Sequence, residues 1–277
     1  MKKWRLRLAV LLSAVPLFLF PTRLAFAQAN IPVAQKFDEF GDIQSSDIAA
    51  RLDNFANELQ AQPGVKGFII TYRSRRDLPG LSGRLMNLMR SYLIDTRGLE
   101  PDRVVGVDGG EAGCLTQELW LVPVGATPTP RSDAYKNEFE DTDSTRKFDE
   151  ASLSADSSYQ QSIYHSLEGF ANALRKEPRA RAYLVAYSGY WINRWEEQDE
   201  RGVKRTHRDV NRDSPGTARR ALARVKAELV KKHGVSPSRI KLMDGGYRKW
   251  GEMELWIVPR GEHTPIPTPN AFPKGRR

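Results

Sequence analysis

The chain has 277 residues but a single cysteine, Cys114, and only four histidines. One cysteine can form neither an internal disulfide nor a cysteine-rich zinc site. The histidines show no His-x-x-x-His or Glu-x-x-His spacing, and the sequence has no Gly-x-Ser-x-Gly or Walker-type glycine motif. The sequence therefore predicts no catalytic constellation, no metal and no cofactor.

Acidic residues are outnumbered, with 34 Asp and Glu against 43 Lys and Arg, which gives a formal net charge of +9. The excess lies mainly at the two ends of the chain. The first 27 residues hold five basic residues and no acid, and Lys274, Arg276 and Arg277 form a basic tail. The body is therefore close to neutral, so its net charge does not favour nucleic-acid binding.

Hydrophobic runs are too short for a bilayer-spanning helix, which needs about 20 apolar residues. The N-terminal run at 8–20 has thirteen mostly apolar residues and follows four basic ones. Ala25-Phe26-Ala27 then supplies the small-x-small pattern of a cleavage site. We predict a signal peptide over 1–27 and a bacterial protein that is periplasmic or secreted, without a membrane span in the mature chain. An uncleaved N-terminal anchor is the alternative.

The body contains one pattern twice, which is the signature of an internal repeat. Leu-x-x-Phe-Ala-Asn-x-Leu at 52–59 returns at 167–174, an offset of 115 residues. Glu-Leu-Trp-x-Val-Pro at 118–123 returns at 254–259, an offset of 136. The offset grows by 21 residues after Tyr187, so the second copy carries an insertion, which we place at 188–211.

Each copy predicts the same order of elements, β-α-β-α-β-β. Apolar residues at helical spacing predict a first helix, and short β-rich runs at 68–72 and 183–187 predict the next strand. Second helices are expected at about 81–96 and 216–232, closed by Gly98 and Gly234. We therefore expect an α+β protein with two tandem units, each a small mixed sheet with two helices on one face.

The predicted boundaries follow from these patterns. Low apolar content and clustered acids at 124–146 indicate a linker, and four prolines mark the final segment as a tail. The expected organisation is a signal peptide, a first repeat, a linker, a second repeat with the insertion, and a Pro-rich basic tail, at 1–27, 32–123, 124–146, 147–260 and 261–277.

Two motifs present in both copies have a structural and a functional interpretation. Asp-Gly-Gly at 108–110 and 244–246 lies between two predicted strands, which favours a tight turn over a phosphate-binding loop, because no helix follows it. Trp120 and Trp256 each lie within a predicted strand. Such residues usually pack in the core or shield a sheet, and the alternative is a stacking platform for a sugar or peptide.

The motif with most chemical content is Arg-Asp-x-Pro-Gly-x-x-x-Arg, which begins at Arg76 and again at Arg212. Its acid, Asp77 or Asp213, precedes a predicted helix, and its second arginine, Arg84 or Arg220, lies in the first turns of that helix. An arginine there can clamp a ligand carboxylate. The alternatives are an N-cap for the acid and a salt bridge between the two side chains.

The insertion at 188–211 mixes charges of both signs with Trp191 and Trp195. A solvated loop or hairpin is the usual structure for such a segment. The two tryptophans could instead stack on a glycan or a partner protein, which makes them candidate contact residues unique to the second copy.

Three further patterns occur in the sequence: Lys-Phe-Asp-Glu at the start of both copies, a Leu-Ser-x-Arg helix at 81–84, and Pro-x-Arg-(Val/Ile) runs at 101–104 and 237–240. With these patterns the sequence resembles the OmpA-like peptidoglycan-binding domain family. In that family an Asp and an Arg hold the diaminopimelate of the wall peptide, which implies Asp77 with Arg84 and Asp213 with Arg220. The family's His-Thr-Asp is absent, the Asp-to-Arg spacing is shorter, and the arginine lies one position early.

The expected function is a non-enzymatic cell-envelope protein that binds the peptidoglycan stem peptide. The alternative is a structural or interaction protein that binds an envelope protein, with wall binding lost. An enzyme would need an acid/base pair, for which Asp108 and Asp244 are the first candidates.

Overall fold

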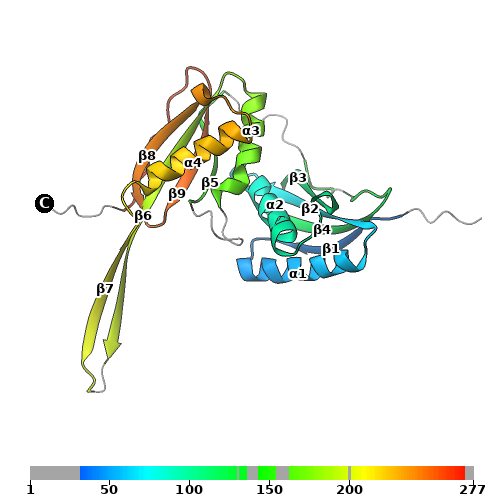
Figure 1. The fold of residues 1–277 in the computed structure, drawn as a ribbon, viewed down its shortest axis with the longest axis horizontal. Coiled ribbons are helices and arrows are strands. Elements are labelled where there is room, and N and C mark those ends of the chain that lie inside the picture. The colour runs from blue at the N-terminus through cyan, green and yellow to red at the C-terminus, as the bar shows by residue number, and fades with distance from the viewer. Residues whose placement is uncertain (1–31, 130, 136–142, 154–161, 199–200, 272–277) are drawn as a thin grey trace, which may run out of the picture. The chain divides into compact units, whose positions relative to one another are not determined.

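The computed structural model describes residues 32–129, 131–135, 143–153, 162–198 and 201–271 (Figure 1). The predicted signal peptide, 1–27, lies outside the described residues. Within the described part the protein has the α+β fold class expected from the sequence, with helices packed on mixed sheets.

The first sheet has the strand order β1-β4-β2-β3. Strands β2 and β3 are parallel, and β4 runs antiparallel to both β1 and β2. Two helices connect the strands, and the second continues into a π-helical turn, η1. The elements are β1 (Gln35–Phe40), α1 (Ser45–Ala61), β2 (Val65–Ser74), α2 (Leu81–Ser91), η1 (Tyr92–Thr96), β3 (Val104–Ala112) and β4 (Thr116–Pro123).

The second sheet repeats this connectivity and adds a long hairpin. Strand β9 lies between β5 and β6, and β6 pairs in parallel with β8, as β2 does with β3. The elements are β5 (Arg146–Ser152), η3 (Ile163–Ser166), α3 (Leu167–Lys176), β6 (Arg181–Gln198), β7 (Lys204–Arg212), α4 (Thr217–Lys231), β8 (Ile240–Arg248) and β9 (Glu252–Val258). Duplication itself stays a prediction from the sequence.

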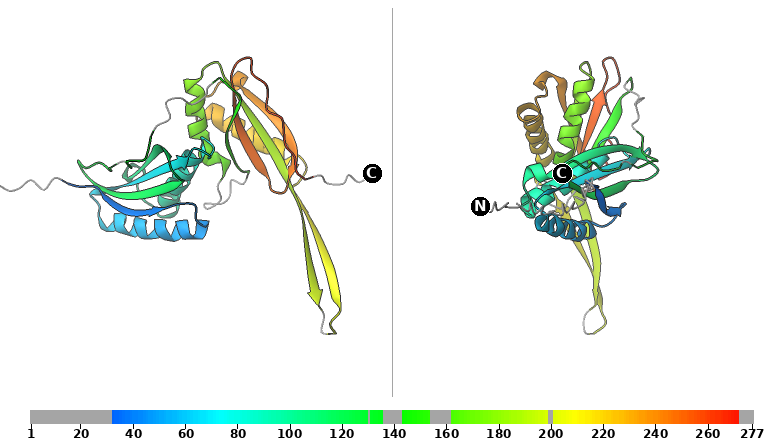
Figure 2. Two further views of the ribbon diagram at one scale, coloured as in Figure 1. Left: turned by 180° about the vertical axis from the view of Figure 1, so that it is seen from behind. Right: turned by 90° about the vertical axis from the view of Figure 1, so that its right-hand side faces the viewer.

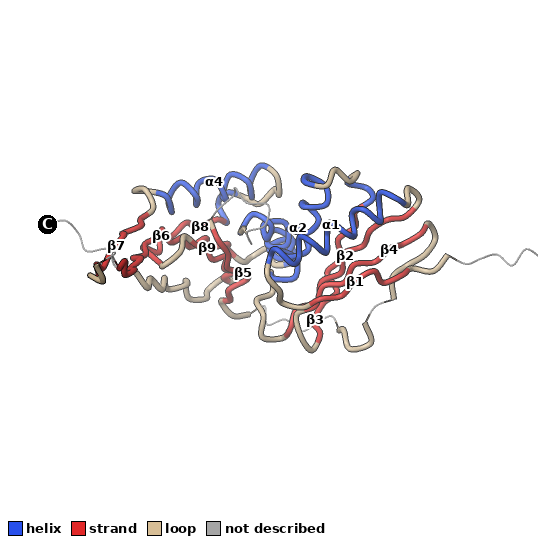
Figure 3. The backbone as a smooth tube through the Cα atoms, turned by 90° about the horizontal axis from the view of Figure 1, so that it is seen from below, coloured by secondary structure: helices blue, strands red, loops and turns tan. Residues whose placement is uncertain are grey.

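The helices lie on one face of the sheets, as Figure 3 shows from below. The apolar spacing explains why: Leu52, Phe55, Ala56 and Leu59 are the buried residues of α1. In α3 the corresponding Leu167, Phe170, Ala171 and Leu174 are buried. Each sheet thus has its own apolar core beneath its helices. Among the helices of the described residues, none combines the length and apolarity that a bilayer crossing demands.

The opposite face of each sheet is covered by the chain that follows its last antiparallel strand. On the first sheet, Tyr72 and Trp120 form an apolar cluster against which Ala126 and Ala134 pack. On the second sheet, the Thr268 amide donates to the Tyr187 hydroxyl at 3.0 Å, and the Asn270 amide donates to the Tyr247 carbonyl. The described parts of the predicted linker and tail therefore shield these sheet faces.

The tight-turn prediction for the two Asp-Gly-Gly motifs is wrong. Both motifs lie inside strands, β3 and β8, where the register with the neighbouring strand shifts by a bulge. A Cβ atom on Gly109 would lie 2.3 Å from the Tyr72 ring, and one on Gly245 would lie 2.3 Å from the Tyr187 ring. The buried tyrosine ring therefore leaves no room for a side chain at Gly109 or Gly245. Gly110 and Gly246 have φ of 88° and 87°, the left-handed region that favours glycine.

The insertion forms a β-hairpin, one of the two structures expected for it. Residues 190–198 of β6 pair antiparallel with all of β7, and the ribbon extends beyond the rest of the sheet (Figures 1 and 2). Most of its side chains are exposed.

Candidate functional site

Asp77 and Asp213 have the same local role in the two sheets. One carboxylate oxygen of Asp77 accepts the Ser74 amide at 2.7 Å, and one of Asp213 accepts the Gly189 amide at 2.5 Å. Asp77 therefore ties the end of β2 to the segment before α2, and Asp213 ties the part of β6 where the hairpin begins to the segment before α4. Neither is an N-cap, because the residues at the caps of α2 and α4 are Gly80 and Gly216.

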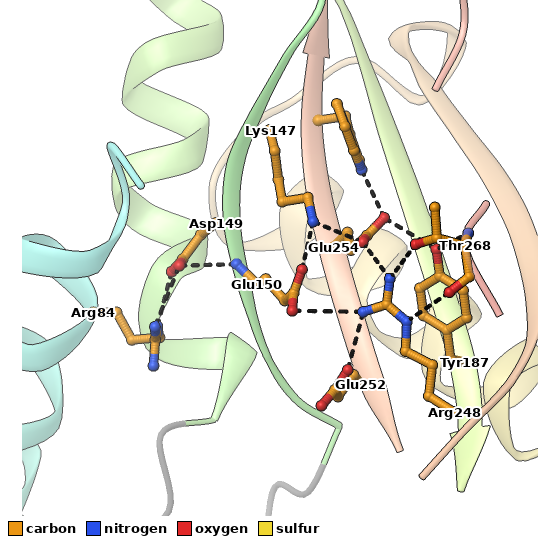
Figure 4. A network of polar contacts seen from close by, with 10 residues as sticks. Arg84, Lys147, Asp149, Glu150, Tyr187, Arg248, Glu252, Glu254 and Thr268 are labelled. Carbon is orange, nitrogen blue, oxygen red and sulfur yellow. Dashed lines mark hydrogen bonds and ion pairs between the residues drawn. The ribbon is translucent and has the colours of Figure 1, made fainter. Parts of the chain in front are cut away.

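Arg84 and Arg220, which occupy equivalent sequence positions, have different surroundings. Arg84 is only 5% exposed, and its guanidinium donates to both carboxylate oxygens of Asp149 on β5, at 2.9 and 3.3 Å (Figure 4). Arg220 is exposed and donates to the Pro215 carbonyl and the Thr217 hydroxyl. Asp77 and Arg84 are thus engaged with different residues, and the buried Arg84 makes a structural ion pair.

The two sheets differ in the partner of an aspartate on their first strand. Asp38 and Asp149 each follow a bulge in the first strand of their sheet. Asp38 finds its cation within the same unit, in Arg51 on α1 at 2.6 Å. Ser166 stands 115 residues after Arg51 and can offer Asp149 only a hydroxyl hydrogen bond. Arg84, from a helix of the first unit, provides the missing charge and links the two sheets.

A hollow of about 770 Å³ lies at the end of β2, beside Asp77. It is formed where the β2–α2 loop, the β3–β4 turn and the segment after β4 meet. The lining residues are Asp42, Ser74, Arg75, Arg76, Asp77, Ala112, Gly113, Cys114, Leu115 and Tyr135.

The hollow has two exposed guanidiniums and two carboxylates, those of Asp42 and Asp77. Arg75 lies 5.8 Å over the Tyr135 ring and 3.8 Å from the buried Glu111, whose nearer cation is Arg73 at 2.7 Å. In the described part of the chain, the Arg76 side chain has no hydrogen-bond or ion-pair partner. The second oxygen of Asp77 likewise accepts no hydrogen bond from a described residue. These groups suit a ligand that carries carboxylates together with an ammonium group.

A second polar constellation occurs once in each sheet. Glu118 and Glu254 are 0% and 1% exposed. Lysine nitrogens approach them closely: Lys36 lies 2.7 Å from Glu118 and Lys147 lies 2.8 Å from Glu254. The indole nitrogen of the following tryptophan, Trp120 or Trp256, donates to the other carboxylate oxygen at 2.9 Å in both sheets.

An arginine and a tyrosine complete each of these clusters, but the arginine comes from a different element in each. In the second sheet Arg248, at the end of β8, lies 2.6 Å from Glu254 and 3.7 Å over the Tyr187 ring (Figure 4). In the first sheet Arg131, from the chain after β4, lies 3.9 Å from Glu118 and 5.7 Å over the Tyr72 ring.

The pKa shifts agree with a charge-balanced structural cluster. Burial alone would raise the pKa of Glu254, but hydrogen bonds from Lys147, Trp256 and Arg248 outweigh it and hold that pKa below its usual value. Burial alone would lower the pKa of Lys147, but its bonds to Glu150 and Glu254 raise it. Both oxygens of Glu254 thus accept hydrogen bonds from side chains of this cluster.

The remaining candidates have local partners. Trp191 lies 5.1 Å from Trp250, and Trp195 stacks on His207 across the hairpin at 5.4 Å. The Asp108 carboxylate accepts the Gly110 amide and the Ser82 hydroxyl, and the Asp244 carboxylate accepts the Gly246 amide. Within the described ranges no three His, Cys, Asp or Glu side chains gather to hold a metal.

Sequence reasoning missed several of these residues. Glu118 and Glu254 were detectable, because each is a charged residue inside an apolar strand and shares a face with the tryptophan two positions on. Arg75 and Tyr135 gave no signal, since their proximity depends on how the chain after β4 returns to β3.

No protein-family model matches the chain, and no curated protein matches it at a significant level. The resemblance to the OmpA-like family therefore stays a prediction.

Proposed function

We propose that this protein is an exported, non-enzymatic component of the bacterial cell envelope and that it binds the stem peptide of peptidoglycan. Export is supported by the basic, apolar and Ala-Phe-Ala segments at 1–27. The family resemblance supports the ligand class. We place cell-wall binding in the first unit, which comprises the sheet β1–β4 with α1 and α2, at the hollow beside Asp77.

The observation that carries this proposal is the charge pattern of the hollow. Arg75 and Arg76 are exposed, and Asp77 keeps one oxygen available beside them. A diaminopimelate side chain ends in a carboxylate and an ammonium group, which match an arginine and an aspartate respectively. Arg75 and Arg76 would take the role that the sequence suggested for Arg84, because Arg84 is engaged with Asp149.

The second unit differs at the corresponding place. Its second strand runs directly into the hairpin, and Asp213 ties the base of that hairpin to Gly189. Arg220 folds back onto Pro215 and Thr217. We therefore assign wall binding to the first unit and a different role to the second.

A sedimentation assay with purified peptidoglycan sacculi tests this assignment. Wild type should sediment with the sacculi, and R75A/R76A and D77N should stay largely in the supernatant. Charge-assisted hydrogen bonds contribute about 1.5–3 kcal/mol each, so losing one should lower the affinity by about tenfold or more.

The matched control is R219A/R224A, which removes two exposed arginines from α4 and so changes the net charge equally. It should sediment like wild type. Equal retention of R75A/R76A and wild type would contradict the proposed site, and equal loss in both double variants would show that only net charge matters.

The alternative function, binding of an envelope protein partner, is favoured by one observation. The hairpin of β6 and β7 exposes Ile192, Trp195, Val203 and Val210 on a ribbon that the first unit lacks.

A further inference from the structure

The hairpin has two faces with different chemistry. Residues directly opposite each other in an antiparallel pair share a face, and the faces alternate along each strand. One face carries Trp195 stacked on His207, next to Glu197, which lies 2.9 Å from His207. His207 thus has contacts with both Trp195 and Glu197 on this face.

The other face leaves two cations opposed to each other. Arg194 lies directly opposite Arg208 in the register of the hairpin, and both are exposed. Neither guanidinium forms a hydrogen bond or ion pair with a residue of the described chain. The nearest acid along that face, Glu196, pairs with Lys204 at 3.6 Å. Like charges directly opposite each other destabilise a strand pair.

An exposed apolar pair adjoins these cations on the same face. Ile192 lies opposite Val210, with exposed fractions of 36% and 52%. An isolated two-stranded ribbon is marginally stable in water, and a third strand with a shared apolar row stabilises it. Within the described strands β7 pairs only with β6, so its outer edge offers unpaired amides and carbonyls to such a strand.

We propose that the outer edge of β7 binds an extended acidic segment of another protein by strand addition. In that arrangement an apolar side chain of the partner extends the Ile192–Val210 row. A carboxylate two residues away extends the Arg194–Arg208 row, where a guanidinium can bind it through two parallel hydrogen bonds. The inference is independent of the wall-binding site, which lies in the other unit.

The charge pattern favours a protein over an anionic bilayer or a nucleic acid. Glu196 and Glu197 lie between the arginine pair and the end of β6, opposite the part of β7 that carries Lys204 and Arg205, so the outer part of the ribbon has charges of both signs. A bilayer or a phosphate backbone that covered the ribbon would meet these acids as well as the arginines. An extended peptide segment, in contrast, can place its carboxylates beside the Arg194–Arg208 row and keep them away from Glu196 and Glu197.

Fluorescence anisotropy with a labelled peptide tests the proposal. The probe repeats valine-threonine-glutamate-threonine, so that valine and glutamate two residues apart lie on the same face of the added strand. A second peptide has lysine in place of every glutamate. Wild type should bind the glutamate peptide and not the lysine peptide, and R194Q/R208Q should bind the glutamate peptide about tenfold more weakly or worse. R219Q/R224Q on α4 is the matched control and should bind like wild type.

Failure of wild type to bind the glutamate peptide, or equal binding by both double variants, would overturn the proposal. Vesicles containing phosphatidylglycerol form a separate arm. If they bind wild type and release R194Q/R208Q while the glutamate peptide does not bind, the ribbon recognises lipid and the strand-addition proposal is wrong. Sacculus binding should be unchanged in R194Q/R208Q, which separates this surface from the wall site.

Discussion

At the scale of single residues, the buried glutamates show how charge is held inside this fold. Glu118 and Glu254 are each surrounded by a lysine, an arginine and an indole nitrogen, so burial does not leave their charge uncompensated. A buried carboxylate without such partners would be strongly destabilising, because it would lose its hydration and gain no hydrogen bond or counter-charge in return. These clusters therefore fix the outer face of each sheet.

Replacing Glu254 with glutamine should lower the free energy of unfolding near neutral pH by about 3 kcal/mol, because Lys147 and Arg248 lose a buried counter-charge. The folded-state pKa of Glu254 lies below its unfolded value. Its stabilisation is therefore present above the unfolded pKa, about 4.3, and is lost as the pH falls through the folded pKa. The free energy of unfolding of E254Q should therefore change less with pH in this acid range than that of wild type.

Urea denaturation at a series of pH values measures this effect. E262Q is the control, because Glu262 is exposed and its side chain has no ion-pair partner in the described part of the chain. Parallel pH profiles for E254Q and wild type would show that Glu254 does not supply the linkage.

At the scale of elements, the sequence predicted most helices and strands because their apolar spacing is local information. Leu52, Phe55, Ala56 and Leu59 point to α1 without knowledge of any other segment. The Asp-Gly-Gly motifs were misassigned because a turn and a bulge use the same residues. Only the tyrosine ring on the neighbouring strand distinguishes them.

The candidate site was harder to predict than the elements. Asp77 lies in the predicted loop and lines the hollow, but Arg84 donates to Asp149, which lies 65 residues away in the sequence and also accepts a hydrogen bond from Ser166. Tyr135 reaches the hollow through a bridge with Glu111 that no local pattern indicates.

Gly109→Ala tests the bulge in β3. The new Cβ would lie 2.3 Å from the Tyr72 ring, which is 1% exposed and has little room to move. We expect a loss of about 1–3 kcal/mol in unfolding free energy, as for overpacked cores. Gly113→Ala is the control, since its Cβ would meet nothing within 4 Å. Thermal and urea unfolding measure both variants, and equal stabilities would contradict the close approach of tyrosine to glycine.

At the scale of the whole molecule, the two sheets are joined by a buried ion pair as well as by the chain between them. Arg84 and Asp149 have side-chain exposures of 6% and 0%. Nearby, the Gly80 amide donates to the Phe148 carbonyl at 2.8 Å, and the Asn87 side chain donates to the His165 carbonyl at 2.9 Å. The two sheets are therefore in contact through α2 and the residues at its start.

A double-mutant cycle measures this connection. R84A and D149A should each lower stability by about 3 kcal/mol or more, because each leaves a buried charge unpaired. The double variant should lose less than the sum, with a coupling of about 1–3 kcal/mol. The same cycle on Arg51 and Asp38, whose side chains are 41% and 23% exposed, should give a coupling below about 1 kcal/mol. Equal couplings in the two cycles would contradict the distinct role of Arg84.

The most direct test of wall recognition by the first unit is a titration of soluble, diaminopimelate-containing stem peptide into isotope-labelled protein, followed by NMR. We predict changes in amide chemical shifts that are concentrated at residues 74–77 and 113–115, that saturate as peptide is added, and that are absent in R75A/R76A. An absence of shifts in wild type, or shifts confined to the hairpin at 190–212, would contradict it.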